Sequence, residues 1–125
     1  MEPNRKNKPD KALCPSGCQS REVLDIIADK WTVLIIHSIA KGPMRHNELS
    51  RALGDISQKV LTQGLRKLER NGIVARTVYP VVPPKVEYAL TTLGTSLVGV
   101  LSTLGVWAEK NFPEVINARK KFDKE

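Results

Sequence analysis

The chain has 125 residues, enough for one domain with a modest core, and its 41% hydrophobic content argues against a disordered protein. Lys and Arg number 20 against 13 Asp and Glu, and the formal net charge of +7 favours an anionic partner. No apolar run approaches the ~20 residues of a membrane span, and the polar start lacks the apolar region of a secretion signal. We therefore expect a cytoplasmic protein with reduced thiols and no membrane partner.

Residues 1–13 are charged and contain two prolines, which predicts a flexible basic N-terminal arm. Cys14 and Cys18 follow, separated by Pro-Ser-Gly. Because Cys18 precedes an expected helix start, the positive end of the helix dipole favours a thiolate that could react with oxidants or electrophiles. Two ordinary thiols fit these residues equally well. A zinc site would need two more ligands, and only His37 and His46 could supply them, so we expect no metal and no cofactor.

Three helices are expected before residue 57. The first runs from a Ser20 cap to Asp29, and the second, at about residues 30–41, is almost entirely apolar and should be buried on most sides, with His37 as a core residue. Gly42-Pro43 ends the second helix, Met44-Arg45 is short enough for a bridge strand, and a third helix spans about residues 46–53.

The stretch 57–72 is the most informative part of the chain. Ser57 is a good N-cap and Asn71-Gly72 a good stop, and between them one helix face is aliphatic while the other carries long donors and amides. Lys and Arg side chains can pair with phosphates, and Gln, Thr or Arg side chains can form hydrogen bonds with base edges. This face is therefore typical of a helix that binds in the DNA major groove. An ordinary amphipathic surface helix is the alternative.

The tight turn 54–56 joins the third expected helix to the helix at 57–72, and the three segments form a helix-turn-helix. Residues 41–90 carry nine basic and four acidic residues, a net 9 − 4 = +5, so the positive charge is concentrated around this motif.

Two β-rich runs, 73–79 and 86–90, flank a proline-rich loop and predict a hairpin with a stiff tip. Arg76 and Lys85 could reach a phosphate backbone or minor groove from it. A hairpin directly after the basic helix predicts a winged helix, although a simple solvated hairpin is the alternative.

A long helix at about residues 91–111, capped by Thr91 or Thr92, carries apolar residues at heptad-like spacing. We interpret this stripe as a homodimer interface, and packing against the chain's own first helices is the alternative. Within an interface, Gly94, Gly99 and Gly105 would allow the two helices to approach closely. Pro113 should break the helix, leaving residues 113–125 as a short C-terminal helix or tail. The predicted interface residues are Leu93, Leu97, Val100, Leu104 and Trp107.

Several of these features together resemble the HxlR (DUF24) family of bacterial transcription regulators, which are MarR-like winged helices. The resemblance covers about residues 18–107 and rests on Cys18, on DKW at 29–31, on ISQKVLTQ at 56–63, on LRKLE at 65–69 and on TVYPVVPPKVEY at 77–88. It implies a homodimer that binds operator DNA, and a Cys18 that senses quinones, aldehydes or oxidants, as in several members. Gly64 departs from the larger residue usual in the family, and no cysteine follows residue 18, so any disulfide would involve Cys14, Cys18 or a small thiol.

The sequence thus predicts a mostly helical α+β winged helix-turn-helix domain at residues 14–112. We expect a homodimeric, sequence-specific regulator, with a repressor preferred, that binds a pseudo-palindromic double-stranded operator and responds to a small oxidant or electrophile through Cys18. A winged helix used only for protein interaction is the alternative, and a thiol enzyme is disfavoured because no histidine or acid lies near Cys18 to orient it. The predicted DNA-binding residues are Ser57, Gln58, Lys59, Thr62, Gln63, Arg66, Arg70, Arg76 and Lys85.

Overall fold

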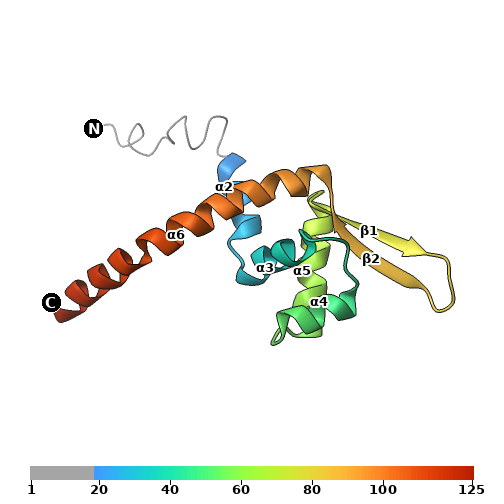
Figure 1. The fold of residues 1–125 in the computed structure, drawn as a ribbon, viewed down its shortest axis with the longest axis horizontal. Coiled ribbons are helices and arrows are strands. Elements are labelled where there is room, and N and C mark those ends of the chain that lie inside the picture. The colour runs from blue at the N-terminus through green and yellow to red at the C-terminus, as the bar shows by residue number, and fades with distance from the viewer. Residues whose placement is uncertain (1–18) are drawn as a thin grey trace.

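The computed structural model describes residues 19–125. Four helices, a two-stranded sheet and one long helix follow one another along the chain (Figure 1). The hairpin projects from one end of the body, and the far half of the last helix projects from the other. This is the mostly helical α+β fold that the sequence predicts. The elements are α2 (Gln19–Ile27), α3 (Lys30–Ile39), α4 (His46–Leu53), α5 (Gln58–Arg70), β1 (Val74–Tyr79), β2 (Lys85–Leu90) and α6 (Thr92–Lys124).

The core forms where α3, α4 and α5 meet the base of the hairpin. Each of these elements contributes aliphatic side chains that are at most 6% exposed, and burying each such side chain stabilises the fold by about 1.5–3 kcal/mol. The core residues are Ile35, Ile36, Ile39, Leu49, Ile56, Leu61, Leu65, Leu68, Ile73 and Val74.

Three helix starts carry side-chain caps. Asp29 accepts from the backbone N–H of Trp31 at 2.8 Å. Ser57 accepts from Val60 N–H at 3.1 Å, and Thr91 accepts from Gly94 N–H at 3.0 Å, as the sequence predicts for these two residues. The predicted cap at Ser20 is wrong, because α2 already begins at Gln19 and Ser20 lies inside it.

The hairpin pairs β1 and β2 antiparallel, in a register that runs from Val74 opposite Leu90 to Tyr79 opposite Lys85. Met44 adds the predicted bridge. Its backbone N–H donates to Tyr88 O at 2.9 Å and its carbonyl accepts from Tyr88 N–H at 2.8 Å. This bridge attaches the segment before α4 to the second strand of the hairpin, so the start of α4 is held next to the hairpin.

The predicted break at Pro113 is wrong, because α6 continues through it to Lys124 as a single helix of 33 residues. A proline inside a helix removes one N–H donor and costs about 3 kcal/mol, but its missing bond exposes only the carbonyl four residues earlier. That residue, Glu109, is exposed, so water can satisfy the carbonyl. Residues 113–124 are therefore the end of α6 and not a separate helix.

The second helix is less buried than its composition predicts. Thr32, Ile35, Ile36 and Ile39 are buried, but Leu34 and His37 are exposed, so His37 is not a core residue. These exposed positions line an apolar groove between α3 and α6, together with Leu101 of α6. Within residues 19–125, no helix is long and apolar enough to cross a membrane.

Candidate nucleic-acid interface

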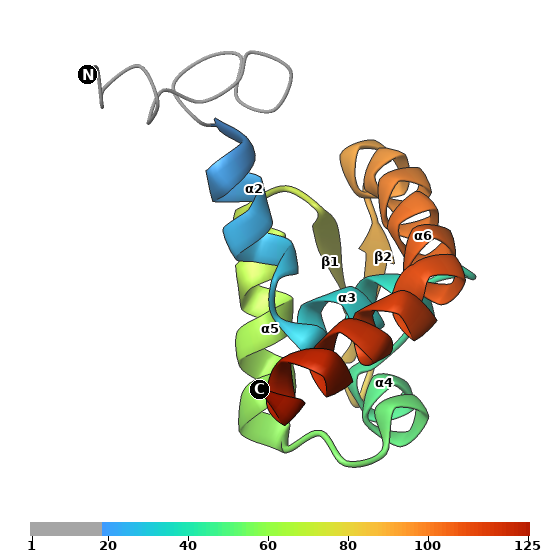
Figure 2. The same ribbon diagram turned by 90° about the vertical axis from the view of Figure 1, so that its left-hand side faces the viewer.

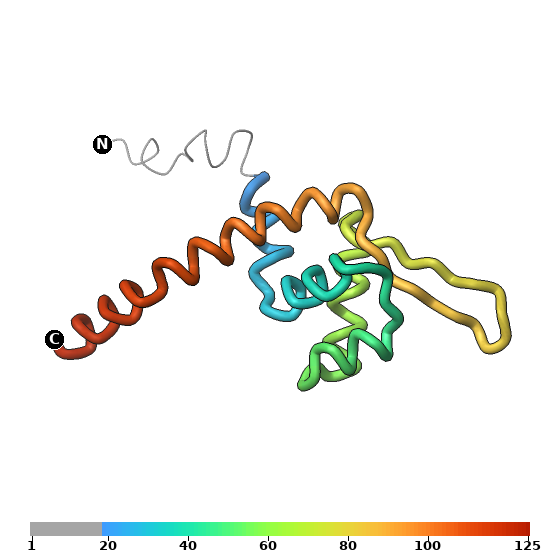
Figure 3. The backbone as a smooth tube through the Cα atoms, viewed as in Figure 1, coloured from blue at the N-terminus to red at the C-terminus, as the bar shows by residue number. Residues whose placement is uncertain are grey.

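Helix α5 is held by one face and presents the other. Leu61, Leu65 and Leu68 are at most 1% exposed, and they fix the rotation of the helix about its axis. The opposite face therefore has one orientation relative to the body. The turn after α4 leads directly into α5 (Figure 3). The exposed side chains of that face are Lys59, Thr62, Gln63, Arg66 and Arg70.

Three cations of this face carry no compensating charge among residues 19–125. Lys59, Arg66 and Arg70 make no ion pair there, and Glu69, the acidic residue of the helix, pairs instead with Arg76 of β1 at 3.8 Å. An unpaired, solvated cation can approach a phosphate without first breaking a bond inside the protein. The face is therefore suited to a polyanion.

Other predicted contact residues on α5 already have structural tasks. The Ser57 oxygen caps the helix, and Gln58 Nε2 donates to Ser50 Oγ on α4 at 3.3 Å. Lys67, next to the predicted face, donates from Nζ to the backbone carbonyl of Asp25 at 2.9 Å and attaches α2 to α5. Near the C-terminal end of α5, residues of both helices line one pocket, and Figure 2 shows α2 at that end of α5. Lys67 thus has a structural role.

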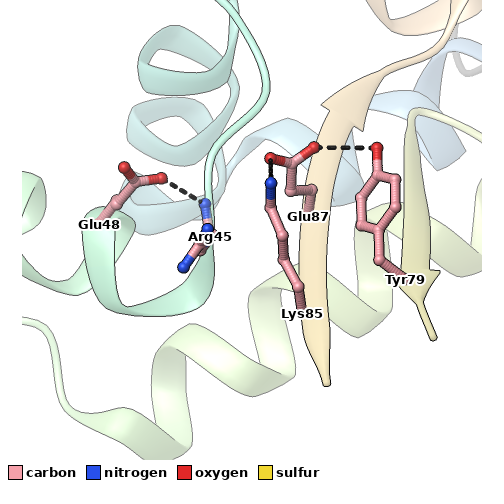
Figure 4. A network of polar contacts seen from close by, with 5 residues as sticks. All are labelled: Arg45, Glu48, Tyr79, Lys85 and Glu87. Atoms are coloured by element: carbon pink, nitrogen blue, oxygen red, sulfur yellow. Dashed lines mark hydrogen bonds and ion pairs between the residues drawn. The ribbon is translucent and has the colours of Figure 1, made fainter. Parts of the chain in front are cut away.

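The hairpin cations are more constrained than those of α5. Arg76 is the partner of Glu69, and Lys85 Nζ lies 3.4 Å from Glu87 Oε2 and 5.1 Å from the centre of the Tyr79 ring. Tyr79 Oη donates to the other oxygen of Glu87 at 3.2 Å, so this carboxylate has a partner on each side (Figure 4). Lys85 therefore presents a neutralised pair to an incoming phosphate, and not a free charge.

One residue that the sequence analysis did not select for DNA binding lies against α5. His46, the first residue of α4, places Nε2 3.3 Å from Thr62 Oγ1. The two residues are 16 positions apart, so only the crossing of α4 and α5 reveals their contact. A polar residue at the start of the first helix of a helix-turn-helix is the signal that could have identified it.

The predicted interface stripe on α6 is mostly uncovered. Leu93, Val100, Leu104 and Trp107 are 56–60% exposed, whereas Leu97 is half-buried against the core. Gly94 also differs from its expected role, since it is buried against the chain's own Ile73 and Leu90. Additional large apolar side chains are exposed on α2 and near the end of α6, namely Val23, Leu24, Phe112 and Phe122.

Cys14 and Cys18, predicted as redox-sensing residues, lie outside the described residues, as does the predicted arm 1–13. Within residues 19–125, no three His, Cys, Asp or Glu side chains gather where they could hold a metal ion.

A helix-turn-helix with an exposed basic second helix, followed by a two-stranded wing, defines the winged helix-turn-helix transcriptional regulators. Residues 26–116 match the family described as HxlR-like helix-turn-helix. The chain belongs to this family of transcriptional regulators, as its motifs predict.

Known relatives agree with this assignment. The HTH-type transcriptional regulator YtfH of Escherichia coli K12 is 44% identical over 107 residues, which cover 86% of this chain and 85% of YtfH. The solved structure of the reduced form of the transcriptional regulator YodB from B. subtilis has a TM-score of 0.71 at 38% identity, covering 78% of this chain and 93% of YodB. The redox regulator HypR in its oxidised form has a TM-score of 0.69 at 41% identity, covering 75% of this chain and 97% of HypR.

Proposed function

We propose that this regulator acts in the cytoplasm by binding a specific double-stranded DNA operator, with α5 in the major groove and the hairpin against the adjoining backbone or minor groove. The observation that carries the proposal is the exposed, unpaired cationic and amide face of α5, held in one orientation by three buried leucines. Lys59, Arg66 and Arg70 supply phosphate attraction, and Thr62 and Gln63 supply hydrogen bonds to base edges. Repression follows where the operator overlaps the promoter.

We further propose a homodimer built on α6. Four large apolar residues that are 56–60% exposed form the stripe, and covering them with a second copy removes this surface from water. A two-fold dimer would present two α5 helices about one DNA turn apart, matching a pseudo-palindromic site.

Control by thiol chemistry is the third part of the proposal. HypR is a redox regulator by name, and YodB has been crystallised after diamide treatment. In the sequence of this chain Cys18 comes immediately before Gln19, the first described residue of α2, and Lys67 attaches α2 to α5. Oxidation of Cys18, alone or with Cys14, would therefore act next to a helix that contacts the DNA-reading helix.

The test is selection of bound fragments from a genomic promoter library, followed by titration of the recovered fragment and a scrambled fragment at several salt concentrations. We expect the recovered fragment to bind at least about 10³-fold more tightly, with a salt slope that reports several phosphate contacts. Diamide treatment should lower the affinity, and Cys18→Ser should abolish that effect. A shallow slope without preference among fragments would instead support a protein-interaction module.

A further inference from the structure

We propose that His46 positions the Thr62 hydroxyl and thereby sets which base Thr62 recognises. The inference rests on the DNA-binding role proposed for α5 and adds a residue from outside that helix. His46 Nε2 lies 3.3 Å from Thr62 Oγ1, and Thr62 is exposed on the same face of α5 as Gln63 and Arg66.

The chemistry of the pair explains why orientation matters. A threonine hydroxyl offers one donor and two acceptor sites, so a freely rotating hydroxyl can bond to either kind of base edge. Among residues 19–125, His46 is its hydrogen-bond partner. If the imidazole nitrogen accepts the hydroxyl proton, Thr62 can offer only an acceptor to the DNA, which suits the amino groups of adenine or cytosine. If the nitrogen donates, the hydroxyl proton stays free for an acceptor such as guanine O6 or thymine O4. In the first case the bond leaves Thr62 with acceptor sites alone, and in the second it fixes the direction in which the remaining donor and acceptor sites point.

His46 is itself held in place, as a positioning residue must be. Two residues earlier, Met44 exchanges both backbone hydrogen bonds with Tyr88, at 2.9 and 2.8 Å. Arg45 N–H donates to Glu48 Oε1 at 2.8 Å, which closes the first turn of α4 (Figure 4). Leu49, one turn further on, is fully buried. The imidazole therefore starts from a backbone that is fixed to the hairpin and to the core.

The partner residue is fixed equally well. Thr62 lies between Leu61 and Leu65, which are 0% and 1% exposed. A threonine in a helix divides between two side-chain rotamers, because its hydroxyl can also bond to the carbonyl one turn earlier. The bond to His46 selects the rotamer that turns Oγ1 toward α4, and this choice also fixes where the methyl group points. Both the polar and the apolar side of Thr62 are thus oriented before DNA arrives.

The experiment uses the full-length protein and the fragment recovered by selection, together with a set carrying every single base-pair change. Four proteins are compared: wild type, His46→Phe, Thr62→Val, and the double variant. Phe keeps a ring without the nitrogen, and Val keeps the shape of threonine without the hydroxyl. We expect both single variants to relax discrimination at the same base pair by about 5–150-fold, which corresponds to the ~1–3 kcal/mol of a specific base contact. The double variant should relax it no further.

Controls separate positioning from a general effect. His46→Gln, which places an amide donor and acceptor at a similar reach, should restore part of the discrimination. Asn47→Ala, at the next position of α4, should leave discrimination at that base pair unchanged. The proposal is overturned if His46→Phe weakens binding to all fragments by one common factor, or if it leaves the Thr62-dependent base pair unaffected while the wild type remains sequence-specific. A wild type with no sequence preference would overturn the proposed function as well.

Discussion

Lys85 and Glu87 form an ion pair of 3.4 Å on one face of β2, at the end of the wing next to the proline-rich loop. The lysine side chain is 36% exposed and the glutamate side chain 24% exposed, so DNA approaching the wing meets both charges together. The cation is therefore already neutralised, and the acid adds repulsion toward phosphate. Removing Lys85 alone should change DNA affinity less than removing an unpaired cation of α5.

Glu87→Gln tests this directly. Glutamine can still accept from the Tyr79 hydroxyl but no longer holds the ammonium of Lys85 as an ion pair. We expect tighter binding to all DNA sequences, by about 1.5–5-fold, since an exposed pair of this kind contributes about 0.2–1 kcal/mol. The salt slope should steepen by up to about 0.9, the increment for one added phosphate contact. Titration of Kd against salt for the wild type and the variant measures both effects.

The double variant Glu87→Gln with Lys85→Ala is the matched control. If the tighter DNA binding of Glu87→Gln comes from releasing Lys85, the increase in affinity should be lost when the lysine is absent. An unchanged slope in Glu87→Gln would mean that the wing does not approach the DNA backbone.

Gln63 and Arg70 should divide recognition between base and backbone. Both are exposed on α5, and Arg70 has no ion-pair partner among residues 19–125. Gln63→Ala should relax preference at one base pair by about 1–3 kcal/mol. Arg70→Ala should weaken binding to every sequence by a similar factor and flatten the salt slope by about 0.9. The measurement is competition binding with single base-pair variants, and equal effects of both substitutions on specific and scrambled DNA would contradict this division.

Most of the fold could be predicted because its signals are local. A cap such as Ser57 or Thr91 is recognised from the residue type and its position before a periodic apolar run, and the leucines of α5 are recognised from their spacing. Pro113 shows the limit of this reasoning. The residue discourages a helix, but whether the helix stops depends on the solvent around its backbone, which the sequence does not reveal.

Side-chain partners were predictable only in part. Lys85 and Glu87 are two apart in a strand, so alternation alone places them on one face, and their pairing could have been inferred. Tyr79 joins them only because the hairpin register sets it opposite Lys85, and the length of the proline-rich loop fixes that register. His37 was misplaced because its neighbours are apolar. It lines the groove between α3 and α6, and the sequence does not show that contact because residues 40–91 separate the two helices.

Leu104 offers a test of the dimer. It is 56% exposed in the protomer, so Leu104→Glu should leave the protomer folded while placing a charge in the proposed interface. We expect sedimentation to report a monomer, and affinity for the complete operator to fall well below that of the wild type. Val106→Glu is the control, because Val106 is 65% exposed on the opposite side of α6, two residues away. Loss of the dimer in Val106→Glu but not in Leu104→Glu would place the interface on the groove side of α6.

Gly94 and Gly99 make a matched pair for the packing of α6 against the hairpin. A Cβ on Gly94 would overlap the carbonyl oxygen of Ile73 and crowd the Leu90 side chain at 3.1 Å, and the backbone of Ile73 cannot move away cheaply. Gly94→Ala should therefore lower the free energy of unfolding by about 1–3 kcal/mol or more, as overpacking does. Gly99 is exposed, with nothing within 4 Å of an added Cβ. Gly99→Ala should therefore raise the free energy of unfolding by up to about 1 kcal/mol, because alanine has the higher helix propensity. Chemical denaturation of both variants measures the difference. Equal effects would mean that α6 does not rest on Ile73 in solution.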